Sequence, residues 1–127
     1  MKKIINTDKA PAAIGPYSQA IEANGTVYIS GQIPIEPSVG KVTAVGIEAQ
    51  TEQVIKNIDA ILNSIGLDAT NVVKTTCLLS SMGDFPKFNE VYARYFGESL
   101  PARATFAVKE LPLGVLVEVE CIAIKDL

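Results

Sequence analysis

The chain contains no histidine. This absence excludes Ser-His-Asp and Cys-His mechanisms, histidine-ligated metal sites and acid–base catalysis by imidazole. Any chemistry must therefore run on Arg, Glu, Tyr, Ser, Thr and Asn side chains, on backbone groups and on water.

Cysteine is scarce, with only Cys77 and Cys121 in the chain. Two isolated cysteines provide neither a disulfide framework nor a zinc site. Both lie in apolar segments typical of strands, so we expect buried structural thiols. A nucleophilic cysteine would also lack histidine, its usual activating partner.

Basic runs and long apolar runs are also missing. The net charge is −3, and the longest basic run is Lys2-Lys3, so the footprint of a nucleic-acid-binding protein is absent. No apolar run could span a bilayer, and polar residues 6–8 follow the lysines too soon for a signal peptide. We therefore expect a cytoplasmic protein with no nucleic-acid or membrane partner.

Apolar residues, by contrast, are abundant. They make up 48% of 127 residues, and the mean hydropathy is +0.26. A chain of this length is expected to form one domain, residues 1–127, with a core that needs no disulfide staples. Because so small a domain has much surface to cover, we expect part of the apolar excess to be buried between subunits.

The order of predicted elements is β-β-β-α-β-α-β-β, an α+β fold with two helices on one face of a sheet. Hydrophobic periodicity and turn residues place strands at 2–6, 17–23, 26–30, 71–80, 101–109 and 115–124, and helices at 47–65 and 84–96.

The Asn24-Gly25 pair predicts a tight hairpin, because a type I′ turn requires positive φ at both central residues. The register of that turn predicts that one side of the hairpin carries Tyr17, Gln19, Ile21, Tyr28 and Ser30. Gly31 follows at the strand end, where it would allow a bend or a close approach of the backbone.

The last two strands carry the polar cluster that most needs explanation. We expect strands 101–109 and 115–124 to pair as a second hairpin through residues 111–114. That pairing would place Arg103 and Thr105 on the same side as Glu118 and Glu120. The charges could form an ordinary cross-strand ion pair or a functional site. The pattern alone leaves both open.

Five segments, in this order, resemble the RidA/YjgF family of reactive-intermediate deaminases: APAAIGPYSQA, YISGQIP, VVKTTCLL, DFPKFNEVYARYF and PARATFAVKELPLGVLVEVE. The resemblance implies a chorismate-mutase-like subunit, three of which join their sheets into a central β-barrel with a cleft at each interface. Members of the family hydrolyse enamines and imines released by pyridoxal-phosphate dehydratases, such as 2-aminoacrylate, 2-iminopropanoate and 2-iminobutanoate. The products are 2-keto acids and ammonia, and neither a metal nor an organic cofactor is needed.

The resemblance also implies roles for individual residues. Arg103 is the expected clamp for the substrate carboxylate, and Glu118 is expected to hold the attacking water, so these two are the candidate catalytic residues. Position 105 differs from many members, which have cysteine there, and Thr105 need contribute only its backbone and its shape if water is the nucleophile. The candidate substrate-binding residues are Tyr17, Ser30, Gly31, Asn89, Arg103 and Thr105.

Two other functions compete with imine hydrolysis. Some relatives are credited with ribonuclease activity or inhibition of translation, which the acidic charge and the missing histidine oppose. A non-catalytic sensor could bind 2-keto acids in the same clefts. Such a sensor would need Arg103 but not Glu118.

Overall fold

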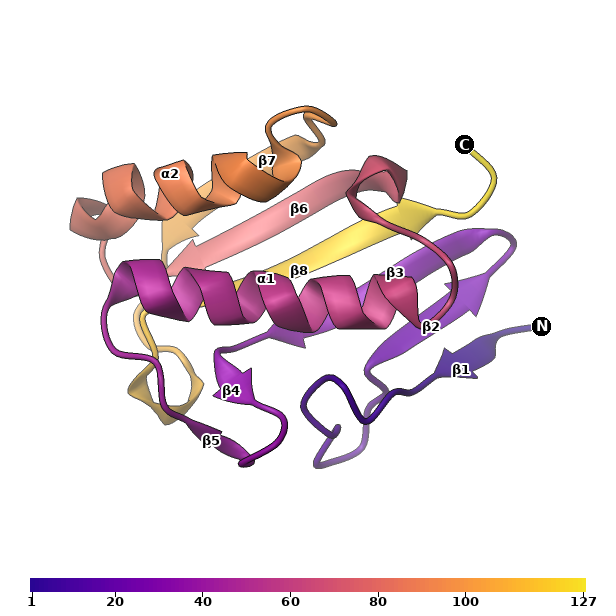
Figure 1. Ribbon diagram of the computed structural model, residues 1–127, viewed down its shortest axis with the longest axis horizontal. Helices are drawn as coiled ribbons and strands as arrows, with labels where there is room; N and C mark the ends of the chain where they lie inside the picture. The colour runs from indigo at the N-terminus through magenta and orange to yellow at the C-terminus, as the bar shows by residue number, and fades with distance from the viewer.

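The computed structural model describes all 127 residues and contains one six-stranded mixed sheet in the order β1-β2-β3-β8-β6-β7. Its strands are β1 (Lys3–Ile5), β2 (Ala20–Ala23), β3 (Thr26–Gln32), β6 (Val72–Leu79), β7 (Ala102–Ala107) and β8 (Val117–Ile124). Helices α1 (Ile47–Asn63) and α2 (Phe85–Phe96) cover one face of this sheet (Figure 1). The predicted α+β architecture is confirmed. A small separate hairpin, β4 (Ile35–Glu36) with β5 (Lys41–Val42), was not predicted.

The hairpin at Asn24-Gly25 is confirmed. Both residues have positive φ, 52° and 79°, and the predicted partners Ala23↔Thr26 and Ile21↔Tyr28 pair across the strands. The first strand of this hairpin, β2, begins at Ala20 rather than at Tyr17, and β3 carries an irregularity between Ile29 and Gln32. Tyr17 therefore belongs to the loop that precedes the sheet.

The predicted C-terminal hairpin is wrong. β7 pairs in parallel with β6, and β8 pairs antiparallel with both β6 and β3, so β6 lies between the last two strands. Residues 108–116 are long enough to cross the width of β6, since adjacent strands lie only about 4.8 Å apart. The strand β6 takes two partners because apolar side chains occupy both of its faces, which suits a central position.

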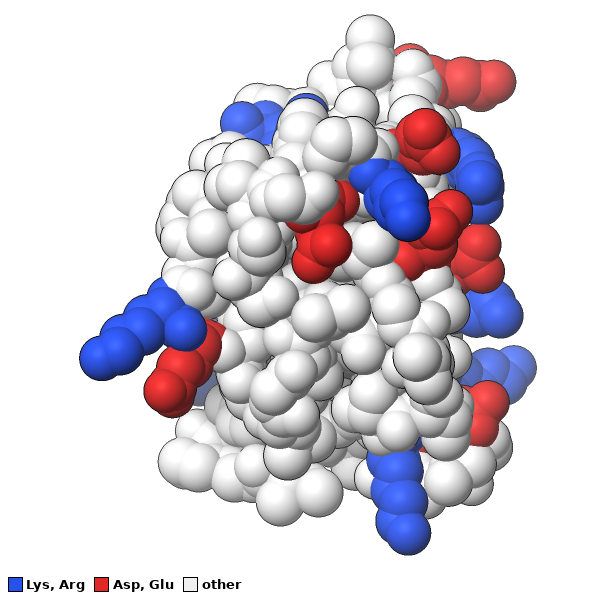
Figure 2. Space-filling view, turned by 90° about the vertical axis from the view of Figure 1, so that its left-hand side faces the viewer, with Lys and Arg blue, Asp and Glu red and all other residues white.

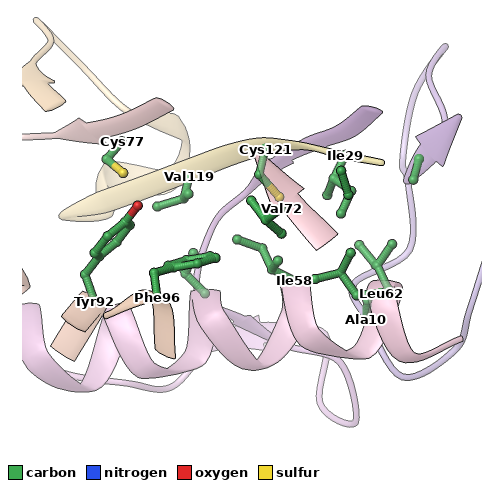
Figure 3. Close-up of a cluster of buried hydrophobic side chains, with 14 of the residues drawn as sticks. Ala10, Ile29, Ile58, Leu62, Val72, Cys77, Tyr92, Phe96, Val119 and Cys121 are labelled. Carbon is green, nitrogen blue, oxygen red and sulfur yellow. The ribbon is translucent and has the colours of Figure 1, made fainter. Parts of the chain in front are cut away.

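The core fills the space between the sheet and the two helices (Figure 3). From the sheet it takes the alternate residues of β3, β6 and β8, and from the helices the residues at helical spacing, among them Val54, Ile58 and Ile61 of α1 and Phe88, Tyr92 and Phe96 of α2. Cys77 and Cys121 are both buried there as free thiols, as predicted. Burial raises the pKa of Cys121 to about 12, so this thiol stays protonated and unreactive.

Three buried amide side chains fasten loops to this core. Gln19 accepts from the Thr7 N–H at 2.7 Å and donates to the carbonyl of Pro11 at 2.8 Å. Asn57 of α1 donates to the carbonyls of residues 33 and 35, and Gln50 of α1 accepts from the backbone N–H of residue 116. Because unpaired backbone groups are costly to bury, these bonds fix loops that lack regular structure.

The opposite face of the sheet is uncovered and largely apolar. A row of cross-strand neighbours, Ile4, Ile21, Tyr28 and Ile122, runs over β1, β2, β3 and β8. Ile4 is 63% exposed and Tyr28 50% exposed. In Figure 2 charged side chains gather mainly on the right, over the helices, and fewer lie on the left, towards this open face. An apolar surface of this kind is typical of an interface between subunits.

Neither helix combines the length and the apolar character that crossing a membrane would require.

Candidate active site

Arg103 and its neighbours form the first of two groups of predicted site residues. The Arg103 side chain leaves β7 beside α2, and its Nη1 donates to Oδ1 of Asn89 at 2.7 Å. Both residues line a cavity of about 430 Å³ between α2 and the segment 97–101, together with Tyr92, Ala93, Phe96, Gly97, Leu100 and Pro101. We call Arg103, Asn89 and this cavity the Arg103 half-site.

Glu118 belongs to a second group. It lines a cavity of about 470 Å³ with Tyr17, Ser30 and Gly31, and the walls are completed by residues of the N-terminal loop, the segment 32–35 and Pro112. The carboxylate of Glu118 accepts no hydrogen bond and forms no ion pair within the chain. We call Glu118, Tyr17, Ser30, Gly31 and this cavity the Glu118 half-site.

Glycine at position 31 leaves room for the Glu118 carboxylate in its observed position. A methyl group at this position would lie 3.0 Å from the Glu118 carboxyl carbon and would overlap one of its oxygens. The sequence-based expectation of a close backbone approach at Gly31 is therefore confirmed, and the approaching group is the candidate catalytic carboxylate.

The environment of Glu118 favours its protonated form. Burial raises the pKa of this carboxyl, and the negative charge of Glu120, two residues further along β8, raises it further. A carboxyl with a raised pKa can accept and return a proton near neutral pH more readily than an ordinary one. Glu118 is thus equipped for general acid–base chemistry.

The remaining predicted residues of the Glu118 half-site differ in how accessible their polar groups and rings are to a ligand. Tyr17 is 55% exposed, and its ring is open to a ligand. Ser30 donates its hydroxyl to the Ser18 carbonyl at 2.6 Å, so it ties the N-terminal loop to β3 and retains only acceptor capacity for a ligand. Its prediction as a substrate-binding residue stays a prediction.

The two half-sites lie on opposite faces of the sheet. Arg103 is the register partner of the fully buried Thr75, which faces the helices, whereas Glu118 is paired with Leu78 on the open face. The prediction that Arg103 and Thr105 share a face with Glu118 and Glu120 is therefore wrong, because it depended on the C-terminal hairpin. An ion pair between Arg103 and either glutamate is excluded within one chain.

Thr105 lies in neither cavity. Its hydroxyl oxygen is buried without a hydrogen-bond partner, and its register partner Cys77 offers only a thiol, which is a weak hydrogen-bonding group. Thr75, on the same face, bonds to the Tyr92 hydroxyl at 2.8 Å. The two threonines thus form a matched pair, one unsatisfied and one satisfied.

Replacing each threonine by valine should have opposite effects on stability. We expect Thr105→Val to raise the free energy of unfolding by about 1 kcal/mol, because an uncompensated buried hydroxyl is removed. Thr75→Val should lower it by about 1 kcal/mol, because the Tyr92 hydroxyl is left unpaired. Urea denaturation at one protein concentration measures both. A loss of stability in both variants would contradict the assignment.

Sequence reasoning missed several residues that shape the site. Gln19 holds the N-terminal loop that contributes Pro11 and Ala12 to the Glu118 half-site. The available signal was the loop itself, since irregular backbone near a core needs polar partners. Tyr92 has the spacing of a core residue on α2, yet its ring also lies against the Arg103 guanidinium.

The sequence profile of the family described as Endoribonuclease L-PSP matches residues 7–125. The chain therefore belongs to this family, the YjgF/RidA family.

Individual relatives are similar over nearly their whole length. The mouse protein named 2-iminobutanoate/2-iminopropanoate deaminase is 50% identical over 125 residues, which are 98% of this chain and 93% of the mouse protein. The solved structure of RidA from an Antarctic Psychrobacter bacterium has a TM-score of 0.91 at 44% identity and covers 96% of this chain and 98% of its own. TdcF of E. coli, solved with bound serine, has a TM-score of 0.92 at 36% identity and covers 98% of this chain and 99% of its own.

Proposed function

We propose that this chain is a cytoplasmic enzyme that hydrolyses the C=N bond of small 2-imino acids and their enamine tautomers, such as 2-aminoacrylate, 2-iminopropanoate and 2-iminobutanoate. The products would be the 2-keto acid and ammonia, and the reaction would limit damage by intermediates that pyridoxal-phosphate dehydratases release. The observation that carries the proposal is the combination of a fixed, solvent-facing Arg103 with an unpaired Glu118 of raised pKa. The deaminase name of relatives at about half identity supports it.

The Arg103 half-site would recognise the carboxylate of the substrate. A guanidinium has five N–H donors in a planar fork that matches a carboxylate, and Asn89 engages only one end of it. Lysine, a point charge on a flexible stem, could not reproduce this geometry.

The Glu118 half-site would supply water and move protons. Ionised Glu118 takes a proton from water while the water oxygen bonds to the carbon of the protonated imine, and the electron pair of the C=N bond goes to nitrogen, which becomes a neutral amine. Glu118 then returns its proton to the nitrogen of this carbinolamine, and the C–N bond breaks as the hydroxyl oxygen forms the C=O bond. The hydroxyl proton passes to the departing ammonia, which is released as ammonium. Because a free imine already hydrolyses in water without a catalyst, positioning and proton transfer are sufficient tasks for the protein.

The two half-sites can meet only if they come from different copies of the chain, since each copy carries them on opposite faces of its sheet. The uncovered apolar row on β1, β2, β3 and β8 gives those copies a surface to bury. We propose a homotrimer that joins these faces and holds one cleft at each interface, where a small 2-imino or 2-keto acid would bind.

Mixing two inactive variants tests this arrangement. Arg103→Ala and Glu118→Gln should each be inactive alone, but random assembly of equal amounts should restore about one quarter of the wild-type rate, because that share of interfaces pairs an intact Arg103 with an intact Glu118. The variants are unfolded together, refolded and assayed with 2-iminobutanoate made by a threonine dehydratase. If the mixture stays as inactive as its components, the two residues do not act across an interface.

The name of the matching family gives ribonuclease activity as a second candidate. The chain offers this chemistry little support, because it has no histidine and its net charge is −3. An assay of RNA cleavage by the wild type and by Arg103→Ala distinguishes a nuclease from an imine hydrolase. Cleavage that survives extra purification and disappears in the variant would favour a nuclease.

A further inference from the structure

Helix α2 presents a continuous stripe of side chains to Arg103. Phe85, Asn89 and Tyr92 are four and three residues apart, which places them on one face of the helix. The Arg103 guanidinium carbon lies 4.7 Å from the centre of the Tyr92 ring and 5.5 Å from that of Phe85, and Asn89 accepts a hydrogen bond from its Nη1. The guanidinium thus contacts two aromatic rings and one amide oxygen.

Tyr92 is itself held firmly. Its ring packs 5.6 Å from Phe88 and 4.7 Å from Phe96, centre to centre, within the core. Its hydroxyl bonds to Thr75 at 2.8 Å, and Thr75 is the register partner of Arg103 on the neighbouring strand. Burial raises the pKa of Tyr92, so its hydroxyl stays protonated and keeps this bond at physiological pH. One residue therefore connects the core, the central strand and the arginine.

We infer that Tyr92, together with Phe85, is a positioning residue that stacks on the Arg103 guanidinium and holds its free N–H groups ready for the substrate carboxylate. This inference rests on the proposed function. A free arginine side chain loses much rotamer entropy when it binds an anion, and a side chain that is already stacked loses less. The rings attract the cation electrostatically without using its N–H donors, which remain available for a planar carboxylate.

A role of Tyr92 in recognising the substrate carboxylate can be distinguished from a role in packing the core. If Tyr92 acts through Arg103, its loss weakens binding of ligands with a carboxylate and spares ligands that have none. If Tyr92 only fills the core, its loss weakens both kinds of ligand alike. The ratio of two inhibition constants, for 2-oxobutanoate and for its methyl ester, therefore reports the positioning role.

We expect Tyr92→Leu to raise the inhibition constant of 2-oxobutanoate about fivefold and to leave that of the methyl ester within about twofold of wild type. Tyr92→Phe, which keeps the ring and loses the bond to Thr75, should have an inhibition constant for 2-oxobutanoate between those of wild type and Tyr92→Leu. Tyr95→Leu is the matched control, because Tyr95 also lies on α2 and bonds through its hydroxyl, to Asp59, but does not contact Arg103. Its ratio should equal that of wild type.

Equal weakening of both inhibitors by Tyr92→Leu, or no change in either, would overturn the inference. If Tyr92→Leu does not fold, Phe85→Leu decides, because Phe85 is less buried: its ratio should rise about twofold, and an unchanged ratio would overturn the inference. Arg103→Ala keeps the two failures apart. A raised ratio in Arg103→Ala beside an unchanged ratio in the Tyr92 and Phe85 variants would overturn only the positioning role, whereas an unchanged ratio in Arg103→Ala would also overturn the carboxylate clamp.

Discussion

Arg103→Ala is expected to lower kcat/KM for 2-iminobutanoate by about 10²- to 10⁴-fold. The loss corresponds to two charge-assisted hydrogen bonds to the substrate carboxylate, each contributing about 1.5–3 kcal/mol. The assay supplies 2-iminobutanoate continuously from a threonine dehydratase and follows its conversion to 2-oxobutanoate over the uncatalysed rate. Because Arg103 lies at an exposed position on the edge strand β7, the substitution leaves the core intact.

Arg103→Lys sharpens the same test, since it keeps the positive charge and removes the planar fork. We expect it to recover little of the lost activity, because lysine cannot form the paired contact and does not stack as well on aromatic rings. Arg94→Ala is the matched control: Arg94 is an exposed arginine on α2 that pairs with Glu52, on the outer side of the helices. Its activity should equal that of wild type, and full activity in both Arg103 variants would remove the clamp from the proposed function.

The sequence predicted elements better than it predicted neighbours. Periodicity located α1, α2 and β6 because each has a strong apolar pattern of its own, and Asn24-Gly25 fixed the first hairpin because a two-residue turn determines its register. The C-terminal hairpin failed because residues 108–116 permit either a turn or a crossing, and local sequence does not say that β6 inserts between β7 and β8. Strand order depends on contacts between distant residues.

The same distinction holds for the site. Residue types and family motifs singled out Arg103 and Glu118, but only the sheet register shows that they lie on opposite faces. Gly31 could be interpreted in advance as a close approach, because glycine in a strand commonly marks one. The contact of Tyr92 with Arg103 could not be predicted in the same way, because the spacing of Tyr92 on α2 is that of a core residue whether or not an arginine lies on its ring.

Glu118→Gln is expected to lower kcat by about 10²- to 10⁴-fold, the usual contribution of a positioned general acid–base group. Binding of 2-oxobutanoate should persist, since Arg103 is unchanged. This combination separates an enzyme from a metabolite sensor, which would bind the keto acid through Arg103 and would not depend on Glu118. Turnover that survives Glu118→Gln would remove the water-holding role from this residue.

The pH dependence supplies a second signature of Glu118. A general base must be ionised, and burial and Glu120 both raise the pKa of Glu118, so kcat should increase with pH through a midpoint above the usual carboxyl range. Glu120→Gln removes the like charge, so we expect its midpoint to move to lower pH. A midpoint that does not move would show that Glu120 has no influence on the group that titrates.

Glu118→Gln should also make the protein more stable at neutral pH while making it less active. A carboxyl whose pKa is higher in the folded than in the unfolded state favours the folded state when protonated, and this advantage is lost as the pH rises through the folded pKa. Glutamine removes the half-buried charge and keeps the shape, so the thermal midpoint at pH 7 should rise above that of wild type. At a pH below the unfolded pKa the two proteins should differ little. A lower midpoint at pH 7 would show that the ionised carboxylate is stabilised by contacts in the assembled protein, because within one chain nothing donates a hydrogen bond to it.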